Sequence, residues 1–320
     1  MAILAVTPLA RAADTEFERG MAALQKGDND VAITCFTAAI KSNPKNDEAY
    51  ARRGAAYFAK HDCDPAIKDF GEAIRLNPNS PQWHYDRGVV HTEKHDLDRA
   101  IQDYSQAIRL DRKFAPAHFN RGNAYYEKQD FDQAIKDFTE AIRLESKTPN
   151  LLQNPSNVFH NRGAAFLAVR EFDSAIDDFS KAIRLDPKVS GSFGSRGLAY
   201  GETKQYAKAV ADFAKTIELD PDDAFAHSRL AWHLATCNEA NLRNGKDAVL
   251  HAKKACELNH WQEPGFLETL AAACAEAGDF KEAVKWQKKA ESLVAGDKAR
   301  QDEARKRLAL YEKGEAYRDK

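Results

Sequence analysis

The sequence lacks an excess of charge of either sign. It carries 47 basic and 49 acidic side chains, which gives a formal net charge of −2 at neutral pH. A chain with so little net charge does not generate the long-range field that draws proteins onto phosphate backbones. We therefore expect no nucleic-acid partner.

The composition argues against two further classes of protein. Charged residues make up 30% of the chain and apolar residues 43%, which is too polar for a membrane protein and too apolar for a disordered tail. The abundance of alanine, lysine, aspartate and glutamate favours helices. We expect a folded, helical protein without a transmembrane segment.

Cysteines are few, and their spacing has no pattern. There are five of them and no C-x-x-C pair, so the sequence predicts neither a disulfide framework nor a zinc site. We interpret them as buried small residues: Cys35, Cys63, Cys237, Cys256 and Cys274. The sequence also lacks a Walker A motif, a G-x-S-x-G motif and a dinucleotide-binding glycine motif. We predict no catalytic residue, no cofactor and no metal.

Residues 1–12, MAILAVTPLARA, form a short apolar leader that ends in small residues. This segment resembles the tail of a secretory signal peptide, but the basic region that would precede its apolar part is missing. Three interpretations stay open: a clipped signal peptide, a disordered leader and an apolar N-terminal cap. The first predicts a periplasmic or secreted protein, and the others predict a cytoplasmic one.

Glycine recurs every 34 residues, with one longer step, and two further residue types keep pace with it. An alanine follows each glycine after twelve residues, and an aromatic residue follows the alanine after four. The glycines are Gly20, Gly54, Gly88, Gly122, Gly163 and Gly197, and the aromatic residues are Phe36, Phe70, Tyr104, Phe138, Phe179 and Phe213. Apolar residues between these positions have helical spacing, so each unit is predicted to be two helices joined by a turn.

Small residues at fixed positions predict close packing of the two helices. A glycine inside a helix costs up to about 1 kcal/mol relative to alanine, so its recurrence needs a packing reason. We expect the glycine to let the backbones approach while the aromatic residue fills the space beside it. We also expect aspartates at the start of the second helices to cap free amides: Asp30, Asp64, Asp98, Asp132 and Asp173.

This arrangement resembles the tetratricopeptide repeat (TPR). The G-x-x-Y, A-x-x-x-F and closing proline positions of that family are all present in Gly54, Tyr57, Ala66, Phe70 and Pro78. The block LAWHLATCNEANLRNGKDAVLHAKKACELN looks like the ending of many bacterial repeat proteins of this kind. The resemblance implies an all-α, right-handed α-α superhelix of about eight helix-turn-helix repeats with a C-terminal capping helix.

The repeat marks and their interruptions define the expected domain boundaries. The interruptions are two prolines and extra residues after the fourth repeat, and a stretched turn in the seventh. We expect repeats 1–4 at 13–148, an inter-repeat loop at 149–155, repeats 5–6 at 156–223, a divergent repeat 7 at 224–263, repeat 8 at 264–297 and a capping helix at 298–320.

An arginine precedes five of the repeat glycines, and an aspartate follows each arginine after sixteen residues. Residues symmetric about the turn of a helical hairpin lie at the same height, so we expect five structural ion pairs rather than a catalytic ladder. The aspartates are Asp69, Asp103, Asp137, Asp178 and Asp212. His91 and His95 stand four apart, but the H-E-x-x-H pattern is missing. We interpret them as a core histidine and a turn histidine.

The family resemblance implies that the first helices line a concave face that holds a protein or peptide. Carried over position by position, it gives a peptide-binding groove for which core packing remains the alternative at each residue. The candidates are Phe17, Met21, Phe58, Tyr85, Phe119, Asn120, Asn123, Tyr126, His160, Asn161 and Trp232.

The functional hypothesis is a monomeric, non-catalytic scaffold that binds an unidentified protein or peptide through this face. The alternative is a structural or self-assembling spacer that forms oligomers through its terminal repeats.

Overall fold

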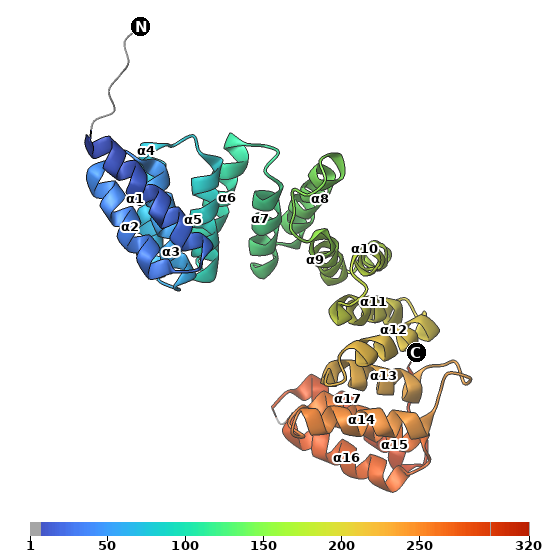
Figure 1. The fold of residues 1–320 in the computed structure, drawn as a ribbon. Coiled ribbons are helices and arrows are strands. Elements are labelled where there is room, and N and C mark those ends of the chain that lie inside the picture. The colour runs from blue at the N-terminus through green and yellow to red at the C-terminus, as the bar shows by residue number, and fades with distance from the viewer. Residues whose placement is uncertain (1–7, 295, 320) are drawn as a thin grey trace. The chain divides into compact units, whose positions relative to one another are not determined.

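The computed structural model describes residues 8–294 and 296–319. Within these residues it contains seventeen helices and no strand (Figure 1). The all-α fold class and the helix-pair architecture predicted from the sequence are therefore confirmed. The chain divides into two compact units between Asn161 and Arg162, a position inside one of the helices.

In the first unit each helix up to residue 147 packs against its neighbours along the chain, as in a stack of helical hairpins. Its helices are α1 (Pro8–Gln25), α2 (Asn29–Ser42), α3 (Asp47–Ala59), α4 (Cys63–Leu76), α5 (Pro81–Glu93), α6 (Leu97–Leu110), α7 (Ala115–Glu127), α8 (Phe131–Lys147) and the beginning of α9 (Pro155–Ala168). Residues 1–7 of the predicted leader lie outside the described residues, and residues 8–12 belong to α1.

The second unit repeats the same hairpin packing from α10 onward. It contains the rest of α9 and α10 (Phe172–Leu185), α11 (Ser190–Glu202), α12 (Tyr206–Leu219), α13 (Ala224–Thr236), α14 (Gly245–Leu258), α15 (Pro264–Glu276), α16 (Phe280–Leu293) and α17 (Lys298–Glu312). None of the described helices has the length and apolar character needed to cross a membrane.

Glycine and aromatic side chains set the distance between paired helices. A Cβ atom added at Gly88 would lie 2.7 Å from the ring of Tyr104, which is closer than real Cβ contacts. Each of the six repeat glycines faces the aromatic residue sixteen positions later in this way, at 2.7 to 3.3 Å. The predicted role of this glycine is confirmed. At Gly20, Gly88 and Gly122, where the contact is shorter than 3.0 Å, a larger residue would force the ring or the helices to shift.

The predicted capping aspartates are wrong by two positions. Three of the second helices, α2, α6 and α8, are capped by Asp28, Asp96 and Asp130, whose carboxylates accept from the backbone N–H three residues later. The turn places a residue with positive φ, such as His95 at 56°, immediately before the capping residue. The predicted residues lie in the first helical turn instead, and three of them pair with a lysine thirty residues later: Lys60–Asp30, Lys94–Asp64 and Lys128–Asp98.

A segment without helix, residues 148–154, separates α8 from α9. The carboxylate of Glu145 accepts hydrogen bonds from the backbone N–H of Asn150 (2.8 Å) and of Leu152 (2.9 Å). Leu152 is buried against the cluster that contains Phe138. The segment is therefore held to the fourth repeat by two backbone hydrogen bonds and by one buried apolar side chain.

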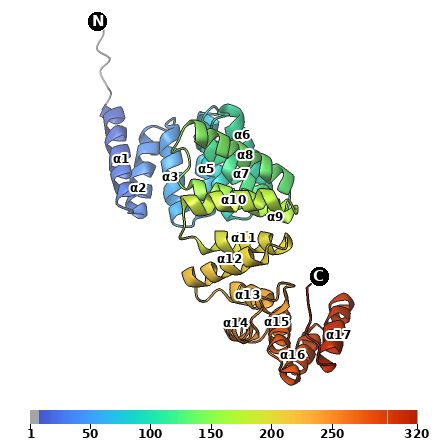
Figure 2. The same cartoon turned by 90° about the vertical axis from the view of Figure 1, so that its right-hand side faces the viewer.

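The last described helix is followed by a returning segment, residues 313–319, which begins with a turn at 313–314 and runs back to α13 (Figure 2). The backbone N–H of Asp319 donates to the carbonyl of Thr236 at 3.0 Å, and Arg318 donates to the carbonyl of Ala235 at 3.2 Å. The helix α17 itself packs on α16 and buries Tyr311 almost completely. The chain in the predicted capping region is thus a helix plus a returning segment.

Candidate functional site

The five predicted arginine–aspartate pairs are confirmed, and all five are bidentate. Nε and Nη2 of each arginine donate to the two oxygens of its aspartate over 2.6–2.9 Å. The pairs are Arg53–Asp69, Arg87–Asp103, Arg121–Asp137, Arg162–Asp178 and Arg196–Asp212. Their recurrence at one position of five successive hairpins assigns them to the scaffold.

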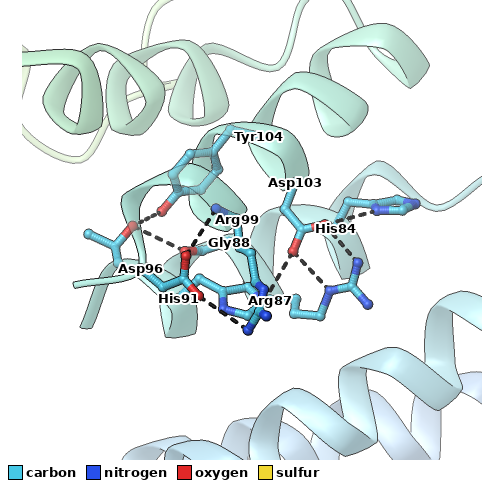
Figure 3. A network of polar contacts seen from close by, with 9 residues as sticks. His84, Arg87, Gly88, His91, Asp96, Arg99, Asp103 and Tyr104 are labelled. Carbon is cyan, nitrogen blue, oxygen red and sulfur yellow. Dashed lines mark hydrogen bonds and ion pairs between the residues drawn. The ribbon is translucent and has the colours of Figure 1, made fainter. Parts of the chain in front are cut away.

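In the third repeat the paired carboxylate, Asp103, lies among Arg87, His84 and His91 (Figure 3). Burial alone would raise the pKa of Asp103, but Arg87 and the neighbouring His84 outweigh it and lower the pKa below its ordinary value. His91 lies on the other side of this carboxylate, 3.9 Å away, and burial lowers its pKa. His91 is therefore a neutral core histidine at neutral pH, as its sequence position indicated.

No group of three or more histidine, cysteine or acidic side chains that could hold a metal occurs among the residues described. Four of the five cysteines are buried and Cys63 is half-buried. Burial raises the pKa of Cys256 to about 12 and that of Cys274 to about 11. These two thiols stay protonated at neutral pH and are poor nucleophiles.

A pocket of about 540 Å³ lies between α3 and α5. We call it the aspartate pocket, because Asp86 is its one carboxylate. The other lining residues are Arg52, Ala55, Phe58, Phe70, Gln82, Trp83, Tyr85 and Val89. Nε2 of Gln82 donates to Oδ1 of Asp86 at 2.7 Å, and Nε1 of Trp83 donates to Asp47 at 2.9 Å. The pocket therefore combines aromatic walls with one acidic group, Asp86, and one basic group, Arg52.

A second pocket, of about 400 Å³, adjoins the first and shares Gln82 and Tyr85 with it. We call it the asparagine pocket, and its other lining residues are Phe114, Pro116, Phe119, Asn120, Leu151, Leu152, Gln153, Asn154, Asn157 and Val158. Nδ2 of Asn120 donates to the hydroxyl of Tyr85 at 3.0 Å. This bond fixes the side chain that separates the two pockets.

The structure brings together four of the predicted site residues in these pockets: Phe58, Tyr85, Phe119 and Asn120. The others in the first unit lie elsewhere. Phe17 and Met21 pack against the core of the first repeat, with the rings of Phe17 and Phe36 5.6 Å apart.

The remaining candidates of the first unit contact neighbouring helices and loops. The ring of Tyr126 lies edge-on to Phe131 at 5.3 Å. Oδ1 of Asn123 accepts from Nδ2 of Asn161 at 2.8 Å. Burial lowers the pKa of His160. These four are half-buried, and their contacts are consistent with packing as well as with binding.

In the second unit, Trp232 is partly covered by the returning segment. Its Nε1 donates to Oδ2 of Asp319 at 2.8 Å, and its ring lies 5.8 Å from that of Tyr317. Trp232 also lines a pocket of about 500 Å³ with Phe225, Arg229 and Arg307. Part of the surroundings of Trp232 is thus formed by the chain itself, and a partner that binds at Trp232 would also contact the returning segment.

The sequence interpretation missed Asp86, Gln82 and the wall formed by residues 151–154. Asp86 stands 34 residues before Asn120, at the same position of the preceding repeat. This equivalent position in the repeat was the signal in the sequence that could have identified Asp86 as a site residue. The wall formed by residues 151–154 has no counterpart in the other repeats and left no periodic signal.

Family profiles match much of the chain. A profile described as TPR repeat matches residues 20–61 and 90–129, one described as Tetratricopeptide repeat matches 115–147 and 156–189, and another of that description matches 191–223. Comparison with curated proteins gave no match.

Solved structures share the fold. The C-terminal part of a TPR repeat-containing protein from Cytophaga hutchinsonii superposes with a TM-score of 0.61 at 19% identity, over 76% of this chain and 95% of that one. A tetratricopeptide repeat protein from Parabacteroides merdae gives 0.54 at 16% identity, over 94% and 99%.

YrrB, described as a TPR protein with an unusual peptide-binding site, gives a TM-score of 0.52 at 22% identity, over 61% of this chain and 94% of that one. At these identities the likeness concerns the fold alone. Together with the profile matches and the hairpin packing, it shows that the chain belongs to the tetratricopeptide repeat proteins.

Proposed function

We propose that this protein is a non-catalytic scaffold that binds an extended segment of another protein across the aspartate and asparagine pockets. Tetratricopeptide repeats in general serve as protein-interaction modules whose stacked repeats create extended binding surfaces. The description of YrrB as having a peptide-binding site is in keeping with this role. The finer proposal concerns where on this chain the segment binds.

The observation that supports this location is the continuity of the two pockets. They share Gln82 and Tyr85 and together carry aromatic rings, one carboxylate and several side-chain amides. Aromatic residues supply contact area at low entropic cost, and amides can pair with the exposed N–H and C=O groups of an extended backbone. The arginine–aspartate pairs, by contrast, are fully used within the scaffold.

A steric block at a pocket-lining alanine tests the proposal. Ala55 lines the aspartate pocket and is half-buried, whereas Ala59 is exposed on the same helix and lines neither pocket. Peptides selected by the wild type from a random phage-displayed library should lose affinity for Ala55→Arg by about tenfold or more, because hot-spot pockets carry most of the binding energy. Ala59→Arg, the matched control, should bind them unchanged. Equal binding by the two variants would place the peptide site elsewhere.

A further inference from the structure

Asp86 differs from the carboxylates of the five arginine–aspartate pairs. Each of those receives two hydrogen bonds from a guanidinium group. Around Asp86, no basic side chain among the described residues reaches salt-bridge distance, and the hydrogen bond that the structure gives it comes from the neutral amide of Gln82 at 2.7 Å. Asp86 is thus a partly buried acid without a cationic partner in the scaffold.

The cation that influences Asp86, Arg52, is already engaged. Arg52 of α3 donates through Nε (3.3 Å) and Nη2 (3.0 Å) to Oε1 of Glu48 on its own helix. Its charge acts on Asp86 only at longer range. Arg52, Glu48 and Asp86 together carry one net negative charge, so the pocket favours a cation.

Burial raises the pKa of Asp86 to about 6, while Gln82 and Arg52 limit the rise. The carboxylate is therefore mostly ionised at the pH of the cytoplasm or of ordinary buffers near neutrality. An ionised group that is held in a poorly hydrated site gains more from an opposite charge than an exposed one does.

The walls of the aspartate pocket suit the same ligand. Phe58, Trp83 and Tyr85 line it, and aromatic faces attract ammonium and guanidinium groups. The indole N–H of Trp83 donates to Asp47, which does not line the pocket, and this bond holds the ring in place. The apolar parts of these rings can contact the methylene groups of a lysine or arginine side chain.

We propose that the aspartate pocket recognises a basic side chain, arginine or lysine, of the bound segment, with Asp86 as the residue that pairs with it. This inference rests on the proposed function and names the chemistry of the partner. The adjoining asparagine pocket holds neighbouring residues of the same segment through Phe119 and Asn120. Asp86 thereby fixes which residue of the partner enters which pocket.

The test compares peptide selection by three full-length proteins: the wild type, Asp86→Asn and Asp132→Asn. Asp132 is exposed on α8 and lines neither pocket, so its variant controls for the loss of one negative charge. The probe is a random peptide library displayed on phage. The wild type and Asp132→Asn should enrich arginine or lysine at one position of the selected motif. Asp86→Asn should lose that preference while it keeps the preference at the other positions.

A synthetic peptide with the most enriched sequence and its counterpart with glutamine at the basic position complete the test. The glutamine peptide should bind the wild type about tenfold or more weakly, whereas Asp86→Asn should bind the two peptides within about twofold. A basic preference that persists in Asp86→Asn, or a wild-type motif without a basic position, overturns this inference and leaves the scaffold function standing. Selection of no motif at all by the wild type overturns the proposed function itself.

Discussion

Replacing Asp86 by asparagine is expected to stabilise the unbound protein above about pH 6. Burial raises the pKa of this carboxyl from an ordinary value of 3.8 to about 6, so the folded state disfavours the charged form. Asparagine has nearly the same shape, and its Oδ1 can still accept the hydrogen bond from Gln82. The substitution therefore removes a charge and little else.

The sign follows from proton binding. Between pH 3.8 and about 6 the folded protein binds more protons at Asp86 than the unfolded chain does, so the free energy of unfolding falls as the pH rises through this window. At about 1.36 kcal/mol for each pH unit between the two values, the loss approaches about 3 kcal/mol. Partial solvent access reduces this loss. We therefore expect the free energy of unfolding of Asp86→Asn to exceed that of the wild type by about 1–3 kcal/mol at neutral pH.

Urea denaturation followed by far-ultraviolet circular dichroism measures this difference, at pH values below and above the window. The two proteins should be almost equally stable near pH 4 and should diverge up to neutral pH. A difference that is the same at both ends would show that the titration of Asp86 is not its source. A residue that costs stability in the free protein is most simply explained by a benefit on binding.

Three further predictions concern the scaffold. Arg121→Ala should lower the free energy of unfolding by about 1–3 kcal/mol in the same denaturation assay. The double variant with Asp137→Ala should lose less than the sum of the two single variants, because the two side chains share two hydrogen bonds. Gly245→Ala should lower the free energy of unfolding by about 1–3 kcal/mol, because the added Cβ would lie 2.5 Å from the backbone at the end of α15. Gly71→Ala should raise the melting temperature instead, because its Cβ would meet no atom closer than 3.8 Å. Tyr311→Ala should lower the free energy of unfolding by about 3–5 kcal/mol. Tyr311→Phe should leave it unchanged, because the hydroxyl has no hydrogen-bond partner among the described residues. A large loss of stability in the phenylalanine variant would contradict this.

Contacts that recur with the repeat could be predicted from the sequence alone. Arg121 and Asp137 lie sixteen residues apart and symmetric about a turn, so hairpin geometry alone brings them together. The contact between Gly88 and Tyr104 follows from the same symmetry. Each such contact is set within a single hairpin and needs no knowledge of the rest of the chain.

Features outside the repeat could not be predicted in this way. In most of the repeats the position of the residue that caps the second helix depends on a positive φ in the turn. The residue types at that position, such as His95, do not predict this conformation. The wall of the asparagine pocket comes from Leu151 and Leu152 in an irregular segment. The importance of Asp86 lies in its lack of a cationic partner, and only the packed structure reveals which cations are already engaged.

The returning segment changes how the last repeats can come apart. In a stack where each helix touches only its neighbours, the end frays one helix at a time. Here Asp319 bonds to Trp232 across 87 residues, and Arg318 bonds to Ala235 across 83. Helices α14 to α17 are therefore enclosed in a closed loop of contacts, and α17 cannot detach until these bonds have broken. Slow amide protons in α15 and α16 should accordingly exchange together with those of α13, in one cooperative opening.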